Sequence, residues 1–146
     1  MRSIRTKITL LVISTVFISV RDHDKGPMVA VARKLVAMGF KIVATRGTAD
    51  VLNAAGAASA IINKVLEGRP HIVDSMKSGD VHLVFNTTEG ALAIADSASI
   101  RQTALSGDIP YYTTVAGARA AVEAIAALQA GALEVAPLQS YFPASF

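Results

Sequence analysis

From Val16 onward, short apolar segments alternate with segments of helical periodicity, and this alternation constrains the fold more than any other feature of the chain. It predicts five strands, at residues 16–20, 40–44, 60–62, 81–85 and 109–112. Helices are expected between them, with a last helix over residues 114–129. Because strands that alternate with helices form parallel sheets covered on both faces, we predict an α/β domain with a doubly wound, three-layer fold.

Local residues predict where the helices begin. Pro27 is suited to the first turn of the first helix, and Pro70 to the start of the third. Thr48 is expected to cap the second helix, while Asp96 or Ser97 is expected to cap the fourth. Glycines that follow several of these segments are suited to helix C-termini.

The chain has 146 residues, enough for one domain with a sizeable core. Charged residues make up only 17%, against about 25% in typical domains, which indicates a surface partly covered by a partner chain or in a homo-oligomer. Arg2, Arg5 and Lys7 are three of the 14 basic residues, so the other 11 balance the 11 acidic residues. The net charge of +3 therefore does not indicate nucleic-acid binding.

The first 14 residues form a basic start followed by an apolar run, which is similar to a secretory signal. No small-residue cleavage site follows, and the run is shorter than the ~20 residues that span a membrane. We therefore expect residues 1–14 to be a leader or remnant without assigned function, no membrane partner, and one domain over residues 15–146. The absence of cysteine excludes disulfides and thiolate nucleophiles, and is typical of a cytoplasmic protein.

Polar side chains that favour phosphate follow three of the predicted strands. Thr45-Arg46-Gly47-Thr48 comes directly after the second strand, at the start of a helical segment. A glycine turn with hydroxyls at a helix N-terminus offers N–H donors and a partial positive charge to an anion. Lys25 follows the first strand and Lys64 the third, so these strand ends together predict a nucleoside monophosphate site.

The fourth strand ends in Asn86-Thr87-Thr88, an amide and two hydroxyls suited to a ribose or a base. Residues 111–114, at the end of the fifth strand, are also suited to lining a pocket. The alternative for each segment is structural, because hydroxyls cap helices, lysines lie in solvent and tyrosines pack in half-buried strands. A structural α/β module without a ligand is therefore a second hypothesis.

Several known chemistries lack their motifs in this sequence. Neither G-x-G-x-x-G nor G-x-x-x-x-G-K-[ST] follows a strand, and no serine lies in a G-x-S-x-G turn. His23, His71 and His82 do not have the spacing of metal ligands. The sequence therefore predicts no metal site.

Five segments together resemble one known domain. They are Ser19-Val20-Arg21-x-x-Asp24-Lys25, Ala44-Thr45-x-Gly47-Thr48-Ala49, Asn63-Lys64-Val65-x-Glu67-Gly68-Arg69-Pro70-His71, Asn86-Thr87-Thr88 and Tyr111-x-Thr113-Thr114. Over roughly residues 16–129 the chain closely resembles the C-terminal allosteric domain of the carbamoyl phosphate synthase large subunit. The resemblance implies the methylglyoxal-synthase-like fold, whose five parallel strands have the order 3-2-1-4-5.

In bacterial members of that family the domain binds UMP, an inhibitor, and IMP, an activator, at overlapping positions. The resemblance implies that the phosphate is held by Lys25, Thr45, Gly47, Thr48 and Lys64. It implies that the ribose or base is contacted by Ser19, Asn86, Thr87 and Thr88. It implies no catalytic residue and no cofactor in this domain.

The resemblance further implies an ornithine site that includes Asp96, Tyr111 and Thr113 and is completed by chain outside this sequence. The implied partners are the rest of the large subunit and its glutaminase small subunit, in an ATP-dependent ligase of pyrimidine and arginine biosynthesis. Tyr112 departs from the family pattern, in which an acidic residue can stand at this position.

Two enzymes share the implied fold. Methylglyoxal synthase uses an aspartate in a Gly-Asp-Gln-Gln stretch after the third strand, where residues 66–71 of this sequence contain none. The lysine- and histidine-bearing segment of the IMP cyclohydrolase domain is also missing. We therefore expect binding without turnover, the alternative being a lyase that acts on dihydroxyacetone phosphate.

Overall fold

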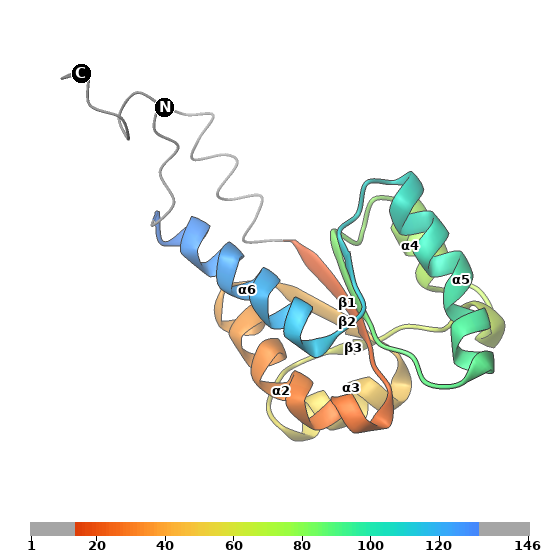
Figure 1. Cartoon of the computed structure of the whole chain (residues 1–146), viewed down its shortest axis with the longest axis horizontal. Helices are drawn as coiled ribbons and strands as arrows, with labels where there is room; N and C mark the ends of the chain where they lie inside the picture. Colours follow the sequence, from red (N-terminus) through yellow and green to blue (C-terminus); the bar gives the residue numbers. More distant parts are fainter. Residues whose placement is uncertain (1–13, 132–146) are drawn as a thin grey trace, which may run out of the picture.

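The structure, a computed structural model, describes residues 14–131 and contains a sheet of five parallel strands in the order β3-β2-β1-β4-β5 (Figure 1). The strands are β1 (Thr15–Ser19), β2 (Lys41–Ala44), β3 (Ala60–Ile61), β4 (Leu83–Asn86) and β5 (Tyr111–Tyr112). The predicted strand order and parallel direction are therefore confirmed. The predicted leader up to residue 13 and the segment beyond residue 131 lie outside the described residues.

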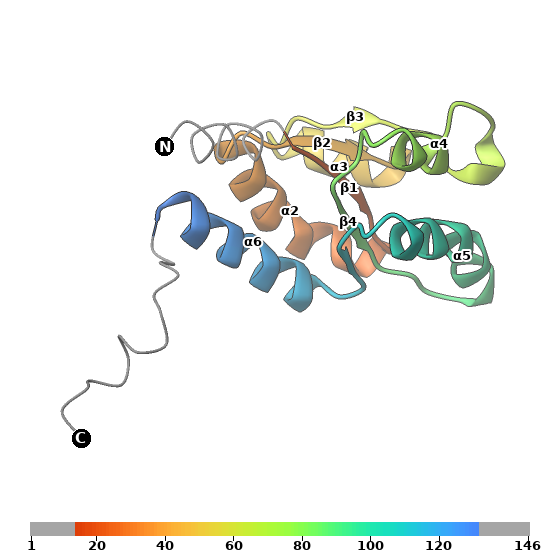
Figure 2. The ribbon, with the colours of Figure 1, turned by 90° about the horizontal axis from the view of Figure 1, so that it is seen from above.

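Helices cover both faces of the sheet and give the predicted three layers. They are α2 (Asp22–Ala37), α3 (Arg46–Ala54), α4 (Ile72–Lys77), α5 (Ala91–Ser106) and α6 (Val115–Gln129), with a short 3-10 helix, η1 (Val65–Glu67), after β3. Figures 1 and 2 show α4 and α5 on one face of the sheet and α2 and α6 side by side on the other, where α3 also packs.

The alternation of side chains along β1 divides the core into two layers. Val16 and Ile18 pack with α2, α3 and α6, whereas Phe17 packs with α4 and α5. All three side chains are fully buried. Because successive side chains point to opposite faces, Ser19 at the end of β1 falls on the face covered by α4 and α5.

The strand register brings three polar side chains together at the carboxyl edge of the sheet. Ser19 pairs with Asn86 across β1 and β4. Thr45 follows Ala44, which pairs with Ile18, so Thr45 lies on the other side of Ser19. The same alternation places all three on the α4 and α5 face of the sheet.

Two predicted helix starts are displaced. The first helix, α2, begins at Asp22, five residues before Pro27, so the expectation that Pro27 lies in its first turn was wrong. Asp22 and Asp24 occupy that turn instead, where carboxylates face the positive end of the helix dipole. The third helix, α4, has His71 as its N-cap, and Pro70 lies one residue before it.

The two predicted polar caps were also wrong. α3 begins two residues before Thr48, with Thr45 at the N-cap position, so Thr48 lies inside the first turn. α5 begins directly after Gly90, and Asp96 and Ser97 lie in its interior. Gly90 has φ of +86°, a conformation that glycine adopts without a steric penalty, and this allows the chain to turn into α5 without a polar cap.

Candidate functional site

A cavity of about 650 Å³ opens at the carboxyl ends of β1, β2 and β4 and extends along the first turns of α5. Sites for small molecules typically enclose about 300–1,000 Å³. The predicted residues that line it are Ser19, Lys25, Thr45, Gly47, Thr48, Lys64, Asn86, Thr87, Thr88 and Asp96. Tyr111 and Thr113 are not part of its lining. The structure therefore brings every residue predicted for the nucleotide to one cavity.

The cavity is also lined by residues that were not predicted as contacts from the sequence. The polar ones include Arg46, Glu67, Glu89 and Ser97, and the apolar ones Val20, Leu92, Ala93 and Ile100. Residues 92, 93, 96, 97 and 100 share one face of α5. The three- and four-residue spacing of these positions could have indicated a shared helix face. It does so only when α5 is known to begin before residue 92.

Three hydroxyl groups meet where β1 and β2 end. Thr45 Oγ1 donates to Ser19 Oγ at 3.1 Å and lies 3.4 Å from Thr48 Oγ1. Thr48 is only 1% exposed, and its Oγ1 accepts the N–H of Val20 at 3.2 Å. The Val20 carbonyl oxygen, at 3.5 Å, is a poor acceptor for the Thr48 hydroxyl, so its hydrogen can turn to a ligand.

The Lys25 ammonium lies against the first turn of α3. A Cβ atom on Gly47 would come within 2.9 Å of Lys25 Nζ. The ammonium forms an ion pair with Asp22, and this hydrogen bond and the Lys25 charge hold the pKa of Asp22 below its ordinary value. The N-terminus of α3 carries a partial positive charge and therefore repels the Lys25 ammonium. An anion that binds between the ammonium and the helix N-terminus would be attracted by both.

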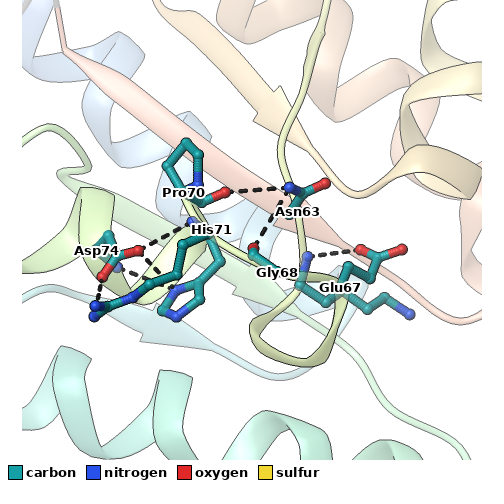
Figure 3. A network of polar contacts seen from close by, with 8 residues as sticks. Asn63, Glu67, Gly68, Pro70, His71 and Asp74 are labelled. Atoms are coloured by element: carbon teal, nitrogen blue, oxygen red, sulfur yellow. Dashed lines mark hydrogen bonds and ion pairs between the residues drawn. The ribbon is translucent and has the colours of Figure 1, made fainter.

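Lys64 lies in the loop between β3 and α4, and a set of hydrogen bonds closes this loop on itself (Figure 3). The Lys64 N–H donates to Glu67 Oε1 at 2.7 Å. Asn63 Nδ2 donates to the carbonyl oxygens of Gly68 and Pro70, at 3.5 and 3.3 Å. These contacts hold the backbone at Lys64, whose side chain lines the cavity.

The far end of the same loop is fastened to α4. Asp74 Oδ2 accepts the N–H of His71 at 3.2 Å, and Arg69 Nη2 donates to Asp74 Oδ1 at 2.9 Å (Figure 3). Burial raises the pKa of Asp74, but the His71 hydrogen bond and the Arg69 charge outweigh it and hold the pKa below its usual range. His71 Nδ1 accepts the Asp74 N–H at 3.4 Å, so this histidine acts as a helix cap.

Thr87 fastens the first turn of α2 to the end of β4. Its Oγ1 accepts the N–H of Arg21 at 3.1 Å, and its hydroxyl donates to the Asp24 carboxylate, which also pairs with Arg21 Nε at 2.8 Å. Burial raises the pKa of Asp24, but the hydrogen bonds from Thr87 and Arg21 outweigh it, and the pKa lies below its ordinary value. Thr87 thus lines the cavity with its hydroxyl already engaged.

The residues predicted for ornithine lie on two elements, α5 and the end of β5. Asp96 lines the cavity from α5. Tyr111 lies on β5, where its hydroxyl accepts a hydrogen bond from Asn86 Nδ2 at 2.6 Å. Thr113 is exposed just beyond β5.

The cavity combines cations, hydroxyl donors and an apolar wall. Lys25, Arg46 and Lys64 supply positive charge, which suits a phosphate monoester. Leu92 and Ile100 supply the apolar surface on which a planar base can pack. Within residues 14–131 no group of three or more His, Asp and Glu side chains is placed to hold a metal ion, and no helix is long and apolar enough to cross a membrane.

The model for the MGS-like domain matches residues 27–113. This chain belongs to the MGS-like domain family. A solved structure of methylglyoxal synthase from Elizabethkingia anophelis NUHP1 aligns over 92% of this chain and 93% of its own, with a TM-score of 0.59 and 14% identity. At that identity the likeness shows the fold alone.

Much higher identity connects this MGS-like domain to carbamoyl phosphate synthase large chains. Those of Brucella suis, Rhizobium meliloti and Mesorhizobium japonicum are 57%, 56% and 52% identical to it over 128 residues. Each alignment covers 88% of this chain but only 11% of the relative. The resemblance drawn from the five sequence segments is therefore confirmed, and the chain spans about a ninth of the length of these relatives.

Proposed function

We propose that this MGS-like domain is the regulatory domain of a carbamoyl phosphate synthase large subunit, and that it binds UMP as an inhibitor and IMP as an activator. It would act, in the cytoplasm, on an ATP-dependent ligase formed by the rest of the large subunit and a glutaminase small subunit. The observation that carries this proposal is the convergence of Lys25 and Lys64, from different elements, on one cavity of nucleotide size.

The proposed roles follow from the chemistry of each group. The two ammonium groups neutralise the phosphate, and Gly47 leaves room for Lys25. Thr48 donates its hydroxyl hydrogen to the phosphate, and Thr45 does so when its hydrogen turns from Ser19 Oγ to the ligand. A charge-assisted hydrogen bond contributes about 1.5–3 kcal/mol, so these contacts dominate the affinity.

The sugar and base have a separate set of proposed contacts. Ser19 and Asn86 lie side by side in the sheet register, and Thr88 follows them at the cavity. A ribose that bridges these residues would leave the base against the apolar face of α5. The hydroxyl of Thr87 supports the site through Arg21 and Asp24.

We further propose that Asp96, Tyr111 and Thr113 contribute to an ornithine site that the rest of the large subunit completes. These residues lie on α5 and around β5, on the side of the cavity away from β3. An Asp carboxylate suits the amino groups of ornithine, whereas hydroxyl groups suit its carboxylate.

Binding without turnover is the proposed outcome at this site. Two carboxylates that line the phosphate side already have partners, since Asp22 pairs with Lys25 and Glu67 accepts the N–H of Lys64. Regulation then needs an effector that binds one state of the whole enzyme more tightly, typically by about 1–3 kcal/mol.

Calorimetry of the purified chain with UMP and IMP tests this proposal. Saturable heat at millimolar or lower concentrations is expected for both nucleotides, and a thermal shift should accompany it, since a ligand that binds only the folded state stabilises that state. No binding of either nucleotide would refute the regulatory function. Release of methylglyoxal from dihydroxyacetone phosphate would establish the lyase alternative instead.

A further inference from the structure

Tyr111 lies outside the cavity lining, yet its hydroxyl contacts a residue inside it. Asn86, at the end of β4, lines the cavity and is only 3% exposed. Its Nδ2 donates to Tyr111 Oη at 2.6 Å, from the neighbouring strand β5. The Asn86 carboxamide is therefore held by a residue of the neighbouring strand. Its second N–H and its carbonyl oxygen are available to a ligand.

The chemistry of the carboxamide determines what those positions can bind. An asparagine side chain has two N–H donors and one carbonyl oxygen with two acceptor positions. One donor is used by Tyr111, and no described residue donates a hydrogen bond to Asn86 Oδ1. Because Asn86 lines the cavity, its Oδ1 is available to accept a hydrogen bond from a hydroxyl of a bound ligand.

We propose that Tyr111 is a positioning residue, which holds the Asn86 carboxamide so that Oδ1 accepts a hydrogen bond from a sugar hydroxyl of the ligand. This inference rests on the proposed nucleotide site and adds to it the residue that orders the sugar contact. Toward the nucleotide, Tyr111 acts through Asn86, because Tyr111 itself is not part of the cavity lining.

The sheet provides a matched control for this role. Tyr112, the next residue of β5, points to the opposite face, where its ring packs edge-on against Phe85 with centroids 5.9 Å apart. No hydrogen bond is formed by its hydroxyl among the described residues. Tyr111→Phe and Tyr112→Phe therefore remove the same atom from adjacent residues, but only the first removes the bond to Asn86.

The test measures the affinity of the full chain for inorganic phosphate, ribose 5-phosphate, UMP and IMP by calorimetry. Tyr111→Phe should weaken ribose 5-phosphate and the nucleotides by about three- to ten-fold, the range expected for one hydrogen bond, and leave inorganic phosphate within two-fold. Tyr112→Phe should leave all four affinities unchanged. In an Asn86→Ala background, Tyr111→Phe should have no further effect, because the residue through which it acts is gone.

Three results would overturn the inference: unchanged affinities in Tyr111→Phe, an equal loss for inorganic phosphate, or an additive loss in the Asn86→Ala background. They differ from failure of the proposed function. If the wild-type chain binds ribose 5-phosphate but neither UMP nor IMP, the effector assignment fails, and the role of Tyr111 is still decided by the ribose 5-phosphate arm. If it binds none of these ligands, both are refuted.

Discussion

Replacing Gly47 with alanine should weaken phosphate binding without harming the fold. Gly47 lies in the first turn of α3, is exposed and has no positive φ. A Cβ there would lie 2.9 Å from Lys25 Nζ and 3.7 Å from its Cε, and apart from the adjacent residues and the backbone of α3 no other heavy atom lies within 4 Å. The only group that must move is the end of a flexible side chain, and that group is the proposed phosphate contact.

The expected effects on stability and binding have opposite signs. Alanine is favoured over glycine within a helix by about 0.5–1 kcal/mol, so the unfolding free energy should stay level or rise. Complete loss of a charge-assisted hydrogen bond costs about 1.5–3 kcal/mol. Because the Lys25 ammonium is displaced rather than removed, we expect the lower end of that range, or about a ten-fold loss of affinity for UMP and IMP alike.

Calorimetry measures the affinity loss, and thermal unfolding without ligand measures the stability. Gly26→Ala is the matched control, since Gly26 lies in α2 next to Lys25 and a Cβ there meets nothing within 4 Å. It should stabilise the fold to a similar degree and leave binding unchanged. Wild-type affinity in Gly47→Ala would show that the position of the Lys25 ammonium does not matter for the ligand.

Two further predictions concern charge. Lys64→Ala should weaken UMP and IMP by a similar factor of about ten, because a phosphate contact does not distinguish the bases, and calorimetry showing loss of only one nucleotide would contradict the assigned role. Folding lowers the pKa of Asp24 and Asp74, so their contribution to stability is present above the unfolded value of about 3.9 and is lost as the pH falls below it. Denaturant titrations between pH 6 and pH 3 should show this decline, and Asp24→Asn should make it shallower.

The parts of the fold that depend on neighbouring residues in the chain could be predicted from the sequence. The alternation of apolar and helical segments predicted each strand to within a few residues, because a parallel sheet buried on both faces needs continuous apolar runs. The order of the strands came from the family resemblance, since pairing between distant strands has no local signature. The start of α5 escaped prediction because Gly90 supplies a turn rather than a polar cap.

Displaced helix starts explain which parts of the site were missed. With α5 expected at Asp96 or Ser97, the residues one and two turns earlier had no reason to face a ligand, although Leu92 and Ala93 line the cavity. With Thr48 expected as a cap, its buried position inside α3 and its bond to the Val20 N–H were not foreseen. Polar residues that follow an apolar run are enough to locate the end of a strand. The residues that share one face of a helix can be identified only when the residue at which the helix begins is known.

The segment Asn86-Thr87-Thr88 shows how structure separates roles that composition leaves equal. Asn86 shares the face of the sheet with Tyr111, whereas Thr87 forms hydrogen bonds with Arg21 and Asp24 at the start of α2. Its N–H also donates to the carbonyl oxygen of Ser19 at 3.0 Å. Because Lys25 directly follows Asp24, these bonds tie the proposed phosphate contact to the strand that carries the proposed sugar contact. If both proposed contacts are correct, Thr87 helps to set the distance between them, and we expect ribose 5-phosphate to bind more tightly than inorganic phosphate or ribose alone, which calorimetry can measure.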